Sequence, residues 1–399
     1  MKEMKAFVLA LCALSPLWMA ATLRAQMRTL NTIHYRIHTD IEQRLAEDMA
    51  VRMEAMYGDY SQRLSNFSPP GDATFEVYLF KNQKDFSHLT DDRFPNTGGV
   101  FIKSRHLLAG FLDGQGRDAL RRTLQHEAFH QFADTAISQR IPPWLNEGIA
   151  QVFEESIWTG RGFLVNQVPV RRIRQVQLDI RERRLEPFRE FITMSDQKWL
   201  DSLKDAPIAA AHYSQAWAMC HFLIFSTDEN NQYKYRSRFI DMLQQIHSGT
   251  RAVDAFTRAF SDNYEGFQSR FLEYVKALRP TAEATFFEYQ GVLGDMMISA
   301  KSRGVRFTDG DEFRKFVTDG NVRLRYTKGD LQWTTDTDPS VYFRDIAGRE
   351  MSGQQFYLSD RKGSPLPDIV CVPIPKLFYR TIFHDEGGKI EHETIVEAK

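Results

Sequence analysis

Cysteine is scarce in this 399-residue chain, which contains three, one of them within the first 25 residues. The other two, Cys220 and Cys371, are far apart in the sequence, and neither stands in a pattern of metal ligands. This argues against a metal site built on cysteine. We expect each of the two to be a free buried thiol, since even an exported chain need not form a disulfide.

An excess of charge of either sign is also missing, because 51 lysines and arginines face 52 acidic residues and leave a net charge of −1. This balance argues against nucleic acid or an acidic membrane surface as the partner. The content of 42 % hydrophobic and 26 % charged residues is that of an ordinary globular protein. At this length we expect two or three domains, each with its own core.

Long hydrophobic runs are absent except at the amino terminus. There two lysines precede an apolar run over residues 6–23, and Leu23-Arg24-Ala25 has the form of a cleavage site. The pattern predicts a secretory signal peptide over residues 1–25, with an uncleaved membrane anchor as the alternative because of the length of the run. We therefore expect an exported protein, periplasmic or extracellular, that contacts a membrane only if this segment stays uncleaved.

The most informative stretch of the chain begins with His126-Glu127-x-x-His130. It falls in a segment of helical period, in which apolar residues recur every four positions. Two histidines four residues apart lie on one face of a helix, so both imidazoles can reach a single metal ion. Glu127 lies beside them and could take a proton from a metal-bound water.

A second helical segment follows the break at Pro142-Pro143 and carries Trp144-Leu145-Asn146-Glu147-Gly148. Glu147, in its first turns, would be a third ligand. Three ligands leave one position of a tetrahedral zinc open, which is typical of a catalytic rather than a structural site. Small residues, Gly148 and Ala150, flank the ligand where a helix must approach closely. The alternative is a surface helix whose histidines bind nothing.

HEAFHQF followed by WLNEGIA resembles the zinc signature of the gluzincin metallopeptidases, in which HExxH precedes a glutamate ligand on the next helix. WLNEG is similar to the signature of aminopeptidase-N-like enzymes, and the wider context is closer to the peptidase-MA-like domain, a largely uncharacterised group of secreted proteins. The resemblance covers about residues 30–279. It implies one Zn²⁺ held by His126, His130 and Glu147, with Glu127 as general base. The glycine-methionine-glutamate-asparagine motif that anchors the substrate in the aminopeptidases is not found, so aminopeptidase specificity is not implied.

Further residues are implied by the resemblance. Tyr213, on an apolar helical segment over residues 209–225, follows Glu147 at a spacing that resembles the aminopeptidase-type gluzincins, where a tyrosine donates a hydrogen bond to the oxyanion. A core tyrosine is the alternative. The resemblance also implies an edge strand that lines the cleft and pairs with extended substrate, with Gly99 and Val100 as candidates. An ordinary hairpin is the alternative there.

Several polar residues near the motif could support it. Asp134, one turn beyond His130, could accept the second ring proton of that histidine, or could be a solvated residue near the helix end. Gln151 and Glu154 share a face with Glu147 and could orient its carboxylate. Asn146 resembles a position near the substrate backbone in related peptidases.

A basic helical segment over residues 170–185 is predicted as a solvated face. The alternative is that one of its arginines faces the cleft and binds a substrate carboxylate through its planar guanidinium.

These patterns predict an α+β protein of three parts after the signal peptide. Residues 28–115 would form an N-terminal α/β subdomain with a small mixed sheet, and residues 116–279 a helical zinc-binding subdomain. Residues 280–399 would form two helices and then a small antiparallel β module of unknown role. Its strands are predicted at 322–326, 331–334, 341–345, 355–358, 369–372, 376–383 and 389–395.

Two functions are compatible with this sequence. The first is an exported zinc metallopeptidase that acts on a peptide or protein substrate. The second is a non-catalytic envelope scaffold or binding protein that keeps the gluzincin fold and recognises its partner through the C-terminal β module. Retention of Glu127 together with all three ligands favours the first.

Overall fold

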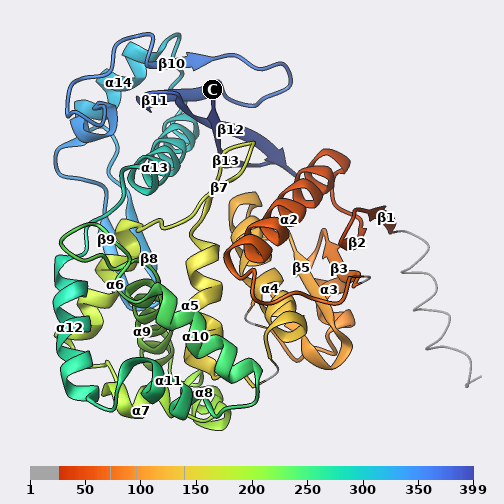
Figure 1. Cartoon of the computed structure of the whole chain (residues 1–399). Helices are drawn as coiled ribbons and strands as arrows, with labels where there is room; N and C mark the ends of the chain where they lie inside the picture. The colour runs from red at the N-terminus through yellow and green to blue at the C-terminus, as the bar shows by residue number, and fades with distance from the viewer. Residues whose placement is uncertain (1–26, 72, 96, 139) are drawn as a thin grey trace, which may run out of the picture.

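The computed structural model describes residues 27–399 except 72, 96 and 139, and it has the α+β architecture that the sequence predicts (Figure 1). The predicted signal peptide lies outside the described residues. Within the described part, no helix combines the length and the apolar character that a membrane crossing requires.

The N-terminal part is a small sheet with helices packed on it. Its elements are β1 (Arg28–Asn31), β2 (Tyr35–Thr39), α2 (Gln43–Arg63), β3 (Phe75–Phe80), α3 (Gln83–Leu89), β4 (Gly99–Ile102), the 3₁₀ helix η1 (Lys103–Arg105) and β5 (Leu107–Phe111). The strand order is β1-β2-β3-β5-β4; β2, β3 and β5 are parallel, and the two outer strands are antiparallel to their neighbours. β4 is therefore an edge strand.

The middle part is helical. Its elements are α4 (Arg117–Ala136), α5 (Pro143–Glu154), β6 (Ile157–Trp158), β7 (Phe163–Leu164), α6 (Val170–Arg181), α7 (Phe188–Ile192), α8 (Asp196–Ser202), α9 (Ala206–Phe225), α10 (Arg236–His247), α11 (Ala252–Phe260) and α12 (Tyr264–Ala277). As the Pro-Pro break predicts, α5 begins at Pro143. A Cβ added to Gly148 would lie 2.4 Å from the Ala216 carbonyl oxygen and 2.5 Å from the Cys220 Sγ, so a glycine is what lets α5 lie directly on α9.

The C-terminal part is a four-stranded antiparallel sheet covered by a helix. Its elements are α13 (Ala282–Ser302), α14 (Gly310–Thr318), β8 (Arg325–Lys328), β9 (Leu331–Thr334), the 3₁₀ helix η2 (Pro339–Phe343), β10 (Phe356–Ser359), β11 (Asp368–Ile374), β12 (Leu377–Glu386) and β13 (Lys389–Ala398). The sheet order is β10-β11-β12-β13, and α13 lies against it (Figure 1). The β8–β9 hairpin projects from this part towards α6.

Two large hydrophobic cores and one small cluster are found in the described chain; the small cluster, in the N-terminal part, comprises Phe80, Phe86, Ala109 and Phe111. The first large core runs from the N-terminal sheet through the helices to α12, and it includes the apolar face of α2, Leu45, Met49, Met53 and Met56. The second lies almost entirely within residues 284–396. The candidate metal ligands belong to elements of the first core, and the C-terminal part packs beside them.

Two strand predictions in the C-terminal part fail. The segment predicted at 341–345 is instead the end of η2, because Pro339 at its start fixes a helical φ and the Asp338 side chain caps it by accepting from the Ser340 N–H. The strand predicted at 322–326 begins only at Arg325. Both described cysteines are free and buried, as expected.

Candidate metal centre

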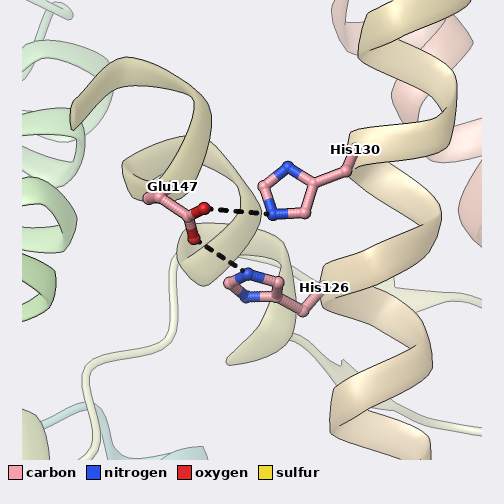
Figure 2. Close-up of side chains that lie close together, drawn as sticks. All are labelled: His126, His130 and Glu147. Carbon is pink, nitrogen blue, oxygen red and sulfur yellow. Dashed lines mark hydrogen bonds and ion pairs between the residues drawn. The ribbon is translucent and has the colours of Figure 1, made fainter. Parts of the chain in front are cut away.

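The two helices of the motif bring the predicted triad together. His126 and His130 project from α4 towards Glu147 on α5 (Figure 2). The His126 Nε2 lies 3.1 Å from one carboxylate oxygen of Glu147, and the His130 Nε2 lies 3.6 Å from the other. One ligand atom from each of the three residues lies within 4.8 Å of the other two.

The side chains of the triad are largely buried: 15 % of His126, 10 % of His130 and 18 % of Glu147 is exposed. Their charges therefore interact strongly with one another. Burial alone would raise the pKa of Glu147, but the two imidazoles outweigh it and hold the pKa well below its usual range. For His126, burial acts to lower the pKa, yet hydrogen bonds with Glu147 and Glu154 raise it well above the ordinary value. Both shifts have the same cause, the close approach of carboxylates to the imidazoles.

Glu127 is tied to the edge strand of the sheet. Its Oε2 accepts the Phe101 backbone N–H of β4 at 2.8 Å. Burial is the largest influence on Glu127 and raises its pKa above the ordinary value of a glutamate. The glutamate of the motif thus lies between the histidines and β4.

Glu154 was predicted to orient the Glu147 carboxylate. In the structure its side chain instead contacts the imidazole of His126. It lies about two turns beyond Glu147 on α5, which places it opposite the other ring nitrogen of His126, with 3.2 Å between the Glu154 Oε2 and the His126 Nδ1. Arg172 of α6 contacts the same carboxylate oxygen at 3.2 Å. A chain of contacts therefore runs from Arg172 of α6 through Glu154 to the imidazole of His126.

Gln151 likewise does not orient the Glu147 side chain. Its amide donates to the backbone carbonyls of Glu147 at 3.2 Å and Tyr213 at 3.0 Å. A buried amide group needs hydrogen-bond partners, and these two carbonyls belong to α5 and α9. The Gln151 side chain therefore links the two helices.

Asp134 fulfils neither of its two predicted roles. Its side chain is 5 % exposed and lies 3.1 Å from the Lys103 Nζ and 3.6 Å from the His106 Nδ1, because η1 and the residue after it pack against this turn of α4. The His130 Nδ1 is buried and has no hydrogen-bond partner within the described residues. The predicted contact between Asp134 and His130 is therefore wrong.

The substrate candidates lie around the triad. Gly99 belongs to the edge strand β4, and a Cβ there would lie 2.6 Å from the Thr123 side chain, so a glycine allows β4 to lie against α4. Val100 is the next residue of that strand. Asn146 is partly buried beside Glu147, and its side chain makes no hydrogen bond in the described part of the chain.

Tyr213 lies on α9, half-buried, with its ring edge-on to Trp199 at a centroid distance of 5.4 Å. Burial is the main reason that its pKa is raised, and the carboxylates of Glu147 and Glu127 raise it further. The phenol is thus protonated at neutral pH and lies within electrostatic reach of the centre.

Two arginines of α6 are paired with acids of α5, which corrects the prediction of a solvated face. Arg172 contacts Glu155 through Nε at 2.5 Å and also contacts Glu154, while Arg171 forms an ion pair with Glu155. No signal in the sequence showed which carboxylates these arginines would meet. Arg122 was also missed, although its position four residues before His126 places it on the ligand face of α4.

A comparison with known families finds one described as "Protein of unknown function (DUF1570)", which matches residues 121–248. The matched segment contains the triad, Glu127, Glu154 and Tyr213. A search of curated proteins gives no match. The chain is thus similar over its helical part to a family whose description assigns no activity.

Proposed function

We propose that this chain is an exported zinc-dependent metallopeptidase that hydrolyses peptide bonds in a peptide or protein substrate. The observation that carries the proposal is the convergence of His126, His130 and Glu147, with ligand atoms within 4.8 Å of one another and Glu127 alongside. Two imidazole nitrogens and one carboxylate oxygen form a donor set of catalytic zinc sites.

The surroundings of the triad fit a divalent cation. The pKa of Glu147 lies well below its usual range, and Glu154 contacts the Nδ1 of His126, which leaves Nε2 facing Glu147 and free to act as a metal ligand. A zinc ion bound here supplies Lewis-acid chemistry, because it polarises a carbonyl oxygen and lowers the pKa of water.

Glu127 is the general base of the proposed reaction. Its raised pKa brings it closer to the working range of a group that must both accept and release a proton. The Phe101 N–H holds Oε2, so Oε1 accepts the proton of the attacking water. Glu127 then gives this proton to the nitrogen of the departing amine.

Tyr213 and β4 complete the proposed site. A phenol that stays protonated can donate a hydrogen bond to the negative charge that develops on the carbonyl oxygen. Gly99 and Val100 lie on the edge strand, where extended substrate backbone can add as a further strand. Export follows from the predicted signal peptide over residues 1–25.

The test is digestion of casein and of a synthetic peptide library by the zinc-loaded protein, with Glu127→Gln as the matched variant. We expect cleavage by the native chain, cleavage about 10²–10⁴-fold slower by the variant, and about one zinc per chain in both. Absence of cleavage by both proteins, with zinc bound in each, would favour the scaffold or binding protein over the enzyme.

A further inference from the structure

A cavity of ≈ 480 Å³ lies between the helices of the metal centre and the C-terminal part of the chain. Its walls come from the start of α4, the end of α5, the start of α6, α13 and β13. Glu154 lies on the wall and contacts His126, so the cavity adjoins the metal centre.

Arg122 faces this cavity from the helix that carries the histidines. Residues 122, 126 and 130 follow one another at intervals of four on α4, so they share one face of the helix. The backbone of Arg122 therefore lies about one turn, roughly 6 Å along the helix axis, before that of His126.

Arg122 differs from every other lysine and arginine on this wall, because within the described residues it alone has no hydrogen bond or ion pair. The other five are paired: Arg52 with Asp48, Arg117 with Glu386, Arg121 with Asp48, Arg171 with Glu155, and Lys389 with Glu391. A largely enclosed guanidinium without a partner is costly unless it meets an anion.

The acids near Arg122 are already engaged. Asp118 pairs with Arg121, Glu155 with both arginines of α6, and Glu154 with Arg172 and His126. The guanidinium of Arg122 is therefore available to a ligand. Its planar group can donate two parallel hydrogen bonds to the two oxygens of a carboxylate.

We propose that Arg122 binds a carboxylate of the substrate one or two residues away from the bond that is hydrolysed. This inference rests on the proposed peptidase function. The spacing follows from the one-turn separation along α4, because an extended peptide advances about 3.3 Å per residue. The carboxylate belongs either to the end of the substrate chain or to an aspartate or glutamate side chain, and the test separates these sources.

The test measures binding, so it does not depend on turnover. Three fluorescein-labelled peptide pools of equal length are titrated into the zinc-loaded Glu127→Gln protein and followed by fluorescence anisotropy. The first pool has a free terminal carboxylate, the second an amidated terminus, and the third an amidated terminus with one internal glutamate. A charge-assisted, partly desolvated contact predicts about tenfold to hundredfold tighter binding of a carboxylate-bearing pool over the plain amide.

Adding Arg122→Gln should abolish that preference and leave the affinity for the amidated pool unchanged, whereas Arg122→Lys should retain part of it. Arg181→Gln is the matched control, since it removes an exposed arginine whose one ion-pair partner among the described residues is the adjacent Glu182. Equal binding of all three pools, or a preference that survives Arg122→Gln in a protein with unaltered melting temperature, overturns the inference. A preference lost in Arg122→Gln, together with no hydrolysis by the native chain, retains Arg122 as a carboxylate site and rejects only the peptidase.

Discussion

Two clusters of histidine and glutamate meet the same helix, α4, and differ in how their carboxylates are neutralised. Within the described residues, Glu147 is contacted by two imidazoles only. Glu393 of β13 is contacted by Arg121, by Arg117 at 3.8 Å and by His384 at 2.5 Å. The second cluster is a closed ion-pair network that joins the C-terminal part to α4, whereas the first consists of three candidate metal ligands without a cationic lysine or arginine on Glu147 among the described residues.

The sharpest way to break this comparison is to remove one histidine from each cluster. We expect His130→Ala to lose stoichiometric zinc and all detectable peptidase activity, because two ligands do not hold zinc tightly enough. His384→Ala should keep both. Zinc content after dialysis, measured by atomic emission, checks this, and loss of zinc from both variants would show that the clusters are not distinct in function.

The next largest effect concerns Glu127. Glu127→Gln keeps the shape of the side chain but cannot accept a proton, so kcat should fall by about 10²–10⁴-fold, the usual contribution of a general base. Zinc content should not change. A variant that kept more than a tenth of the native kcat would assign the proton transfer to another group.

The ion-pair network predicts a pH dependence of stability. Burial acts to raise the pKa of Glu393, but His384, Arg121 and Arg117 outweigh it and lower the pKa to about 2. This carboxylate therefore stabilises the fold fully above about pH 4.5, and its contribution, roughly 3 kcal/mol, is lost as the pH falls towards 2. Urea unfolding of native and Glu393→Gln proteins between pH 6 and 3 should show a shallower decline in the variant, and parallel curves would refute the assignment.

The smallest expected effect lies at the support of His126. Glu154→Gln keeps a hydrogen-bond acceptor at the His126 Nδ1 but removes its charge, so zinc affinity should fall by about 10–100-fold. Competition with a fluorescent chelator measures this. Asp134→Asn is the control on α4 that should leave zinc affinity unchanged, because Asp134 contacts Lys103 and His106 instead.

Local patterns predicted much of the fold because they act over a few residues. The helical period around His126 and the Pro-Pro break before the next helix both produced the predicted elements, α4 and α5. The failure at 341–345 has a local cause as well, since Pro339 and the cap from Asp338 favour a 3₁₀ turn over a strand of similar apolar content.

The partners of side chains were harder to predict than the elements. Glu154, Asp134 and the arginines of α6 were placed on correct helices, but their contacts come from other elements. A long charged side chain pairs with whichever opposite charge the packing of the elements brings near it. The periodicity of one helix does not indicate which residue of another element this will be.

By itself, the sequence determined that two imidazoles four residues apart share a helix face and that a glutamate follows on the next helix. Only the tertiary structure decided that Glu154 and not Asp134 supports a histidine, that β4 reaches Glu127, and that Arg122, beside a cavity, has no partner among the described residues. The physical reason is one of range: helix geometry fixes neighbours one turn apart, whereas contacts between α4, α6 and the C-terminal part depend on how whole elements pack.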